Sequence, residues 1–258
     1  MLNIQRSIPI PRIGLEKLMN YIIAVGEDPG IECRELRDRG LDIGKGRGDI
    51  TRFFQRIGIV EVNGDCSIRL TNVGNTLYRA LNRDVGLFKM LFHLVLYREL
   101  PHYRLLINTI SEEGPMGIDE LHKSINQRMR ELSPTAWLNE VAFKALIGLA
   151  TDLGVVDVTN GEVGIRYTAS VSECIRRAVV TIGSQRVLRI DELSNCIRQL
   201  LGNIDIRQAL VNGLDGCVEP IIAPGPMGPK STYFRVLDED CVVRQVVNAI
   251  LSMPMFNY

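Results

Sequence analysis

The chain has 258 residues, 46% of them hydrophobic and 23% charged, so it can bury a substantial core, and its length suggests two or three modest domains. It contains no run of about 18 apolar residues and no secretion-signal pattern at its start, so we expect no membrane insertion and a cytoplasmic location. Lys plus Arg and Asp plus Glu each number 30, which excludes a strongly basic protein; any DNA-binding surface must be local.

The first recurring pattern lies between residues 31 and 71. Ile31-Glu-Cys-Arg-Glu-Leu36 is typical of a helix start, and apolar residues from Ile50 to Ile57 have the spacing of an amphipathic helix that ends at Gly58. The stretch from Gly58 to Thr71 then contains two short runs around Asn63-Gly64. This pattern predicts a β-hairpin directly after a helix.

An apolar helical stripe follows between residues 85 and 100. Its members are Phe88, Leu91, Phe92, Val95 and Leu96. The stripe predicts a linker helix or a dimerisation surface. Packing into a core is the other interpretation, and we prefer it slightly.

The same pattern recurs about 96 residues further along. Ile118-Asp-Glu-Leu121 is a second helix start, with acidic residues in the first turn. An amphipathic helix from Leu138 to Leu149 ends at Gly154, and the stretch from Gly154 to Thr168 predicts a hairpin around Asn160-Gly161.

A third copy is traced less directly. We expect a first helix from Val171 to Ile182, a second over residues 190–201 that begins with Ile190-Asp-Glu-Leu193, and a third over residues 206–214. Residues 218–222 and 233–236 form the predicted hairpin, which has a Pro/Gly-rich tip. A closing helix is expected over residues 238–251.

Three helices followed by a hairpin, with Leu70-Thr-Asn-Val-Gly74 leaving the second strand, resemble the winged-helix superfamily. The resemblance implies a mainly α protein with small β-hairpins (α+β), arranged as tandem winged-helix domains. The expected domains are 1–83, a linker helix at 84–101, 102–169, and a winged-helix-like domain at 170–258. In such domains the third helix enters the DNA major groove and the hairpin, or wing, contacts the backbone or minor groove.

The first copy carries the main DNA-binding candidates. Residues 44–56 contain four cations against one acid, Asp49, and three glycines that allow close approach to phosphate. We expect Arg47 and Arg52 to reach the DNA and Lys45 and Arg56 to hold phosphate. Gln55 lies on the same face, and Arg69 assists from the wing. A solvated turn and helix face is the alternative interpretation.

The other two copies offer fewer candidates. Asn139 and Lys144 lie on the predicted third helix of the second copy, where Glu140 reduces the attraction to phosphate, so this copy is also a candidate for binding protein. Trp137 is interpreted as a core or interdomain residue rather than a base-stacking one. In the third copy the candidates are Arg207, Gln208 and Lys230.

No motif predicts an enzyme, a metal site or a cofactor. Residues 225–232 resemble a phosphate-binding loop, but Pro229 stands where glycine is required. The six cysteines lack paired-ligand spacing and are interpreted as buried apolar residues, with a disulfide in the last third as an alternative for a hyperthermophilic source. The expected partner is double-stranded DNA, bound by a transcription regulator or sequence-recognition subunit. A homodimer or an assembly adaptor of an ATPase, segregation or defence complex is the alternative.

Overall fold

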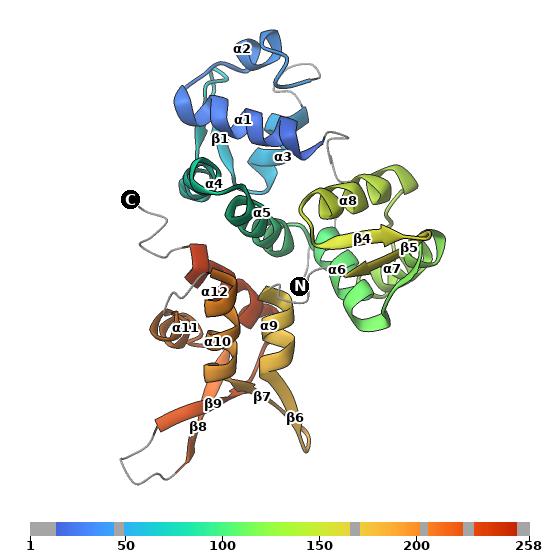
Figure 1. Cartoon of the computed structure of the whole chain (residues 1–258), viewed down its shortest axis with the longest axis vertical. Helices are drawn as coiled ribbons and strands as arrows, with labels where there is room; N and C mark the ends of the chain where they lie inside the picture. Colours follow the sequence, from blue (N-terminus) through green and yellow to red (C-terminus); the bar gives the residue numbers. More distant parts are fainter. Residues whose placement is uncertain (1–13, 44–48, 166–170, 202–205, 224–229, 252–258) are drawn as a thin grey trace. The chain divides into compact units, whose positions relative to one another are not determined.

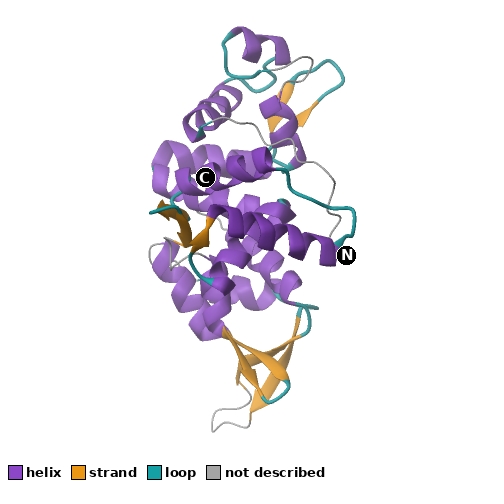
Figure 2. Cartoon of the chain, turned by 90° about the vertical axis from the view of Figure 1, so that its right-hand side faces the viewer, coloured by secondary structure: helices purple, strands orange, loops and turns teal. Residues whose placement is uncertain are grey.

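The computed structural model describes residues 14–43, 49–165, 171–201, 206–223 and 230–251. The chain forms two compact units, residues 1–167 and 168–258, and each is described by itself. Helices predominate and the strands are confined to small antiparallel sheets, so the protein is α+β as expected (Figure 2). Within the described residues, no helix has the length and apolar character needed to cross a membrane.

The first copy has the expected order of elements (Figure 1). They are α1 (Leu15–Glu27), α2 (Cys33–Asp38), α3 (Asp49–Arg56), β1 (Val60–Val62), β2 (Ile68–Leu70) and α4 (Asn72–Arg83). Ile50, Phe53, Phe54 and Ile57 are fully buried, which confirms the helical face predicted from their spacing. The chain leaves α3 through Gly58 with φ +71°, a conformation that favours glycine.

The Leu-Thr-x-x-Gly junction connects β2 to α4 through two specific contacts. The Thr71 hydroxyl accepts a hydrogen bond from Gly74 N (3.1 Å) as a helix N-cap and donates to Gly58 O (2.6 Å). A Cβ on Gly74 would lie 2.1 Å from Ile59 O, so no larger residue fits without movement of the backbone. The junction therefore fixes α4 against the start of the hairpin.

The segment expected as a linker helix is α5 (Val85–Glu99), followed by α6 (Pro101–Glu113). Residues 91–97 of α5 are buried without interruption, so the helix is covered on all sides. The Phe92 ring meets Phe54 of the first copy edge-on at 6.1 Å. Core packing, the interpretation we preferred, is confirmed.

The second copy contains β3 (Met116–Gly117), α7 (Ile118–Leu132), α8 (Glu140–Asp152), β4 (Val156–Thr159) and β5 (Glu162–Ile165). The predicted hairpin turn is confirmed, because Asn160 and Gly161 connect β4 and β5 with φ +54° and +82°. The sequence analysis missed β3, which pairs antiparallel with β5 and gives the order β3-β5-β4.

The second unit contains one more hairpin than expected. Its elements are α9 (Val171–Ala178), β6 (Val179–Ile182), β7 (Gln185–Arg189), α10 (Ile190–Leu201), α11 (Arg207–Gly213), β8 (Val218–Ala223), β9 (Lys230–Val236) and α12 (Glu239–Leu251). The prediction of a helix as far as Ile182 was wrong: α9 ends at Ala178, and the β-branched residues after it form a strand. The sheet order is β6-β7-β9-β8, and the closing helix lies where it was predicted.

One pairing pattern recurs in all three copies. The residues just before the second helix pair antiparallel with the second strand of the hairpin, as β3 with β5 and β7 with β9. In the first copy the same pairing is a single bridge between Glu32 and Ser67. The three copies therefore share one topology, with an added strand, β6, in the third.

All six cysteines form disulfides, which corrects their interpretation as free buried residues. The pairs are Cys33–Cys66, Cys174–Cys196 and Cys217–Cys241. Two of the bonds lie in the last third of the chain, where a disulfide was the alternative, and the bond in the first copy was not anticipated. Each bond joins segments that are more than 20 residues apart in the sequence.

Candidate nucleic-acid interface

The outer face of α3 carries three of the predicted residues. Arg52 and Gln55 are exposed and Arg56 is half-buried, whereas Phe53 and Phe54 face the core. The Arg52 guanidinium lies 3.8 Å from the Asp49 carboxylate, and burial lowers the pKa of Arg56. Arg56 keeps its charge at neutral pH. Lys45 and Arg47 lie outside the described residues.

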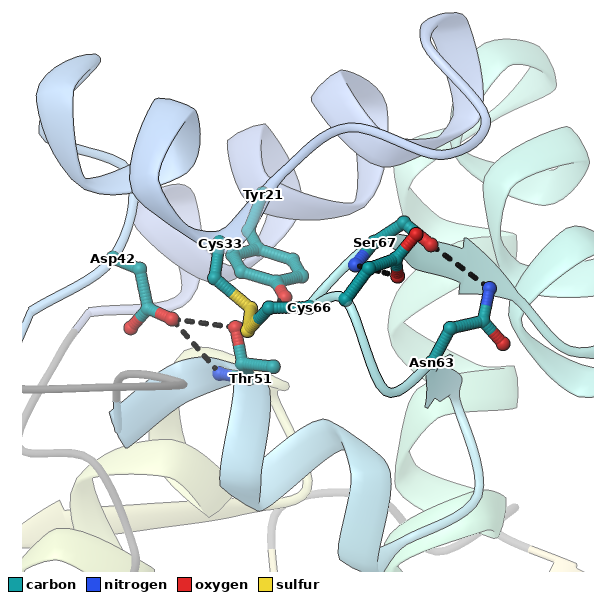
Figure 3. Close-up of a disulfide and its surroundings, with 8 residues drawn as sticks. Tyr21, Cys33, Asp42, Thr51, Asn63, Cys66 and Ser67 are labelled. Atoms are coloured by element: carbon teal, nitrogen blue, oxygen red, sulfur yellow. Dashed lines mark hydrogen bonds between the residues drawn. A yellow bond between two sulfur atoms is a disulfide. The ribbon is translucent and has the colours of Figure 1, made fainter.

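Asp42, a residue that the sequence analysis did not select, fixes the start of α3. Its buried carboxylate accepts hydrogen bonds from Ile50 N (2.9 Å), Thr51 N (3.2 Å) and the Thr51 hydroxyl (2.6 Å). Since the Thr51 hydroxyl donates to Asp42, the Tyr21 hydroxyl must donate to Thr51 (2.6 Å; Figure 3). Burial raises the pKa of Tyr21, which keeps this donor protonated.

The hydrogen bonds around the start of α3 bear on nucleic-acid binding in two ways. Asp49 N donates to Ile43 O at 2.7 Å, so the backbone is held together on both sides of residues 44–48. The amides of Ile50 and Thr51 are already bound to a carboxylate and are not available to a phosphate group. A phosphate group at the start of α3 could therefore be bound by its side chains and not by these two amides.

The wing of the first copy contributes a balanced set of charges. Arg69 is exposed on β2 and stands directly opposite Glu61 of β1. At the hairpin tip the Asp65 carboxylate accepts a hydrogen bond from Ser67 N at 3.0 Å, and this bond is the main cause that lowers its pKa, with a smaller effect from Arg69. The positive charge of Arg69 is therefore partly compensated within the hairpin.

In the second copy the predicted residues have partners within the protein. Asn139 is the N-cap of α8 and accepts a hydrogen bond from Ala142 N at 2.8 Å, and Lys144 pairs with Glu140 at 2.5 Å. Beside them, Trp137 is 52% exposed and Val141 is 45% exposed. Trp137 is therefore not a core residue, and the other part of the expectation, an interdomain contact, stays a prediction. The start of α8 therefore presents exposed Val141 beside a neutral ion pair, and exposed Trp137 lies just before it.

In the third copy the predicted residues are also engaged. The Arg207 guanidinium pairs with Asp191 at 2.7 Å, and the Gln208 amide donates to Asn212 at 2.9 Å. Lys230 begins β9 and pairs in register with Ala223, but its side chain lies outside the described part of the structure. Of the three third helices, α3 alone combines exposed Arg and Gln side chains with a firmly capped start.

Comparison with known proteins adds no relative. No family model, curated protein or solved structure matches the chain. The function must therefore be inferred from the geometry of the chain itself.

Two further features bear on other kinds of site. A polar groove of about 800 Å³ runs along α7 and is lined by His122, Lys123, Asn126, Gln127, Arg130 and Glu131. In the described part of the chain, no group of three or more His, Cys, Asp or Glu side chains is placed to hold a metal ion. The geometry of these side chains gives no specific reason to assign a reaction.

Proposed function

We propose that this protein is a non-catalytic DNA-binding protein built from tandem winged-helix domains, acting as a transcription regulator or sequence-recognition subunit. The observation that carries the proposal is the outer face of α3, where Arg52, Gln55 and Arg56 project from a helix held by Asp42. Arginine and glutamine are the side chains that bind base edges and phosphates with paired hydrogen bonds. A capped, buried helix start keeps those side chains in fixed register.

The recurring topology supports the winged-helix part of the proposal. Each copy has helices followed by a hairpin, and the segment before the second helix pairs with the hairpin's second strand. In a winged helix this pairing holds the wing beside the second and third helices, so that both can contact one DNA duplex. We assign α3 as the recognition helix of the first copy and β1-β2 as its wing.

A DNA titration against salt concentration tests the proposal. We expect Arg52→Ala/Arg56→Ala to weaken binding to duplex DNA by tenfold or more and to reduce the salt slope by about two phosphate contacts. Arg176→Ala/Arg177→Ala in α9 is the matched control, because these side chains are 58% and 53% exposed, compared with 53% for Arg52. If the wild type and both double variants bind DNA with equal affinity, α3 is not part of the DNA interface.

The proposal includes a cytoplasmic location, where the DNA is accessible. Three disulfides are compatible with this location in a hyperthermophile, whose intracellular proteins keep such bonds. Alkylation of thiols during cell lysis, followed by mass spectrometry, measures their state in the cell. Fully reduced cysteines in that measurement would contradict a disulfide-bonded cytoplasmic protein.

A second candidate function, an assembly adaptor, is favoured by α8. Val141 is exposed on α8 and Trp137 is exposed in the segment just before the helix; with the neutral Glu140–Lys144 pair beside them, they have the chemistry of a protein interface and not of a phosphate contact. If α8 is an interface between copies of this chain, sedimentation analysis will show a concentration-dependent dimer that Trp137→Ala/Val141→Ser abolishes. A protein that stays monomeric and retains DNA binding favours the first candidate.

A further inference from the structure

The first copy has a covalent joint where its wing meets its second helix. Cys33 is the first residue of α2, and Cys66 stands two residues before β2, with the two Cα atoms 5.6 Å apart (Figure 3). Backbone hydrogen bonds surround the disulfide: Cys33 N donates to Cys66 O (3.0 Å), and Ile68 N donates to Ile31 O (2.9 Å). The disulfide and these bonds attach the wing to the helical part of the domain.

The corresponding joints in the other copies are made by strand pairing alone. β3 and β5 pair over two residue positions, and β7 and β9 pair over three. In the first copy the pairing is the one bridge Glu32–Ser67, made with backbone hydrogen bonds from Gly30 N, Cys33 N and Ile68 N, and the disulfide lies directly beside it. The other two disulfides join α9 to α10 and the start of β8 to α12, so neither is placed at a wing joint. The bond therefore supplements the shortest of the three pairings.

Cys66 lies at the end of the hairpin turn, where its amide donates to Asn63 O at 3.0 Å. Cys66 has φ +66°, in the left-handed region that costs free energy for a residue with a side chain. Cys33 is buried, whereas Cys66 is half-buried and is the more exposed residue of the pair. Without the bond, the backbone hydrogen bonds donated by Gly30 N, Cys33 N and Ile68 N are left to hold the wing.

The bond also encloses the proposed DNA-contact helix. The loop that it closes runs from residue 33 to residue 66 and contains α2, α3 and β1. Opening the bond leaves the two ends of this loop joined by backbone hydrogen bonds alone. Whether the disulfide is formed therefore affects how α3 and the wing are placed relative to each other. Both must keep this arrangement to contact one duplex.

We propose that Cys33–Cys66 is a redox switch, in which reduction by a dithiol releases the wing from α2 and weakens DNA binding; this rests on the proposed function. A thiolate of the reductant attacks Cys66 Sγ, the sulfur–sulfur bond breaks, and Cys33 leaves as a thiolate that takes up a proton. The second thiolate of the reductant then attacks its own sulfur in the mixed disulfide and releases Cys66, which is protonated in turn. The protein gains two electrons and two protons, and the reductant becomes a disulfide.

The test uses the full chain with and without dithiothreitol, a small dithiol, and measures duplex DNA affinity. We expect reduction to weaken binding about tenfold in the wild type and in Cys217→Ala/Cys241→Ala, which keeps the bond in question. Cys33→Ala/Cys66→Ala should bind weakly in both conditions, with no response to the reductant. A response of the same size in Cys33→Ala/Cys66→Ala would assign the effect to another bond and overturn the proposal.

Amide hydrogen exchange tests the release of the wing from α2 independently of DNA binding. Reduction should speed exchange at Cys33 and Ile68 by tenfold or more and leave Val163 of β5, in the second copy, unchanged. Unchanged exchange at Cys33 and Ile68 in the reduced protein overturns the switch, whatever the DNA result. Faster exchange in a protein whose oxidised form binds no DNA supports the mechanical release and overturns the proposed function instead.

Discussion

At Gly74 the packing of the first copy leaves no room for a side chain. A Cβ there would lie 2.1 Å from Ile59 O, a backbone atom that already accepts the Thr71 amide. We expect Gly74→Ala to lower the free energy of unfolding by about 2 to 3 kcal/mol, since the strand or the helix must shift. Gly148→Ala is the control, because it lies in α8 with no atom within 4 Å of the added Cβ; it should be neutral or stabilising by up to about 1 kcal/mol. Denaturant titration measures both, and an equal loss in the two variants would contradict the steric explanation.

His93 makes stability depend on pH. It is fully buried in α5, its Nδ1 lies 2.9 Å from the Tyr103 hydroxyl, and burial lowers its pKa from 6.5 to about 4. The folded state therefore holds a neutral ring while the unfolded state takes up a proton below its ordinary pKa. This stability is fully present above pH 6.5 and is lost as the pH falls towards 4, by about 3 kcal/mol in total.

Denaturant titrations across this range should show the loss in the wild type and in His122→Gln. His93→Leu should flatten it, and an unchanged slope in His93→Leu would contradict this assignment.

At the scale of the elements, the start of α3 is capped by a residue that lies outside the helix. Asp42 caps it from across residues 44–48, so we expect Asp42→Ala to cost about 1 to 2 kcal/mol and to weaken DNA binding by displacing α3. Asp38→Ala removes an exposed carboxylate 3.7 Å from Arg34 and should change neither quantity measurably. Thermal unfolding and DNA titration of both variants check this, and wild-type stability of Asp42→Ala would contradict the capping role.

The elements also show what could be read from the sequence. The face of α3 and the Asn160-Gly161 turn follow from periodicity and turn chemistry, and they were predicted correctly; the face of α8 was predicted correctly in part, because Val141 is 45% exposed. Val179-Val-Thr-Ile182 is β-branched throughout and precedes Gly183, so the signal for β6 was present, but it was merged into the preceding helical pattern. The two residues of β3 are too few to show a period. The role of Asp42 was not readable, because it caps a helix that begins seven residues later.

At the scale of the whole molecule, the disulfides divide between the two units. Cys174–Cys196 and Cys217–Cys241 close loops of 22 and 24 residues within the second unit. We expect Cys174→Ser/Cys196→Ser to lower the stability of that unit by about 3 kcal/mol. Hydrogen exchange should accelerate in α9 and α10, while α1 and α4 of the first unit keep their rates. Equal acceleration in both units would contradict a local effect.

The pairing of cysteines could not be deduced from their spacing. Six cysteines allow 15 pairings, and partners 22 to 33 residues apart meet only after the helices have packed. The partners of the candidate residues within the protein were equally hidden. Asn139, Lys144 and Arg207 have suitable chemistry in the sequence, but each has a partner inside the protein.

The contact between the Phe54 and Phe92 rings determines where an expression fragment of this protein can end. A fragment ending at residue 83, where the repeat pattern ends, would remove α5 and leave the Phe54 ring without its neighbour at 6.1 Å. Such a truncation exposes aromatic surface to water and invites aggregation. A minimal expression fragment for the first copy should therefore extend through residue 100.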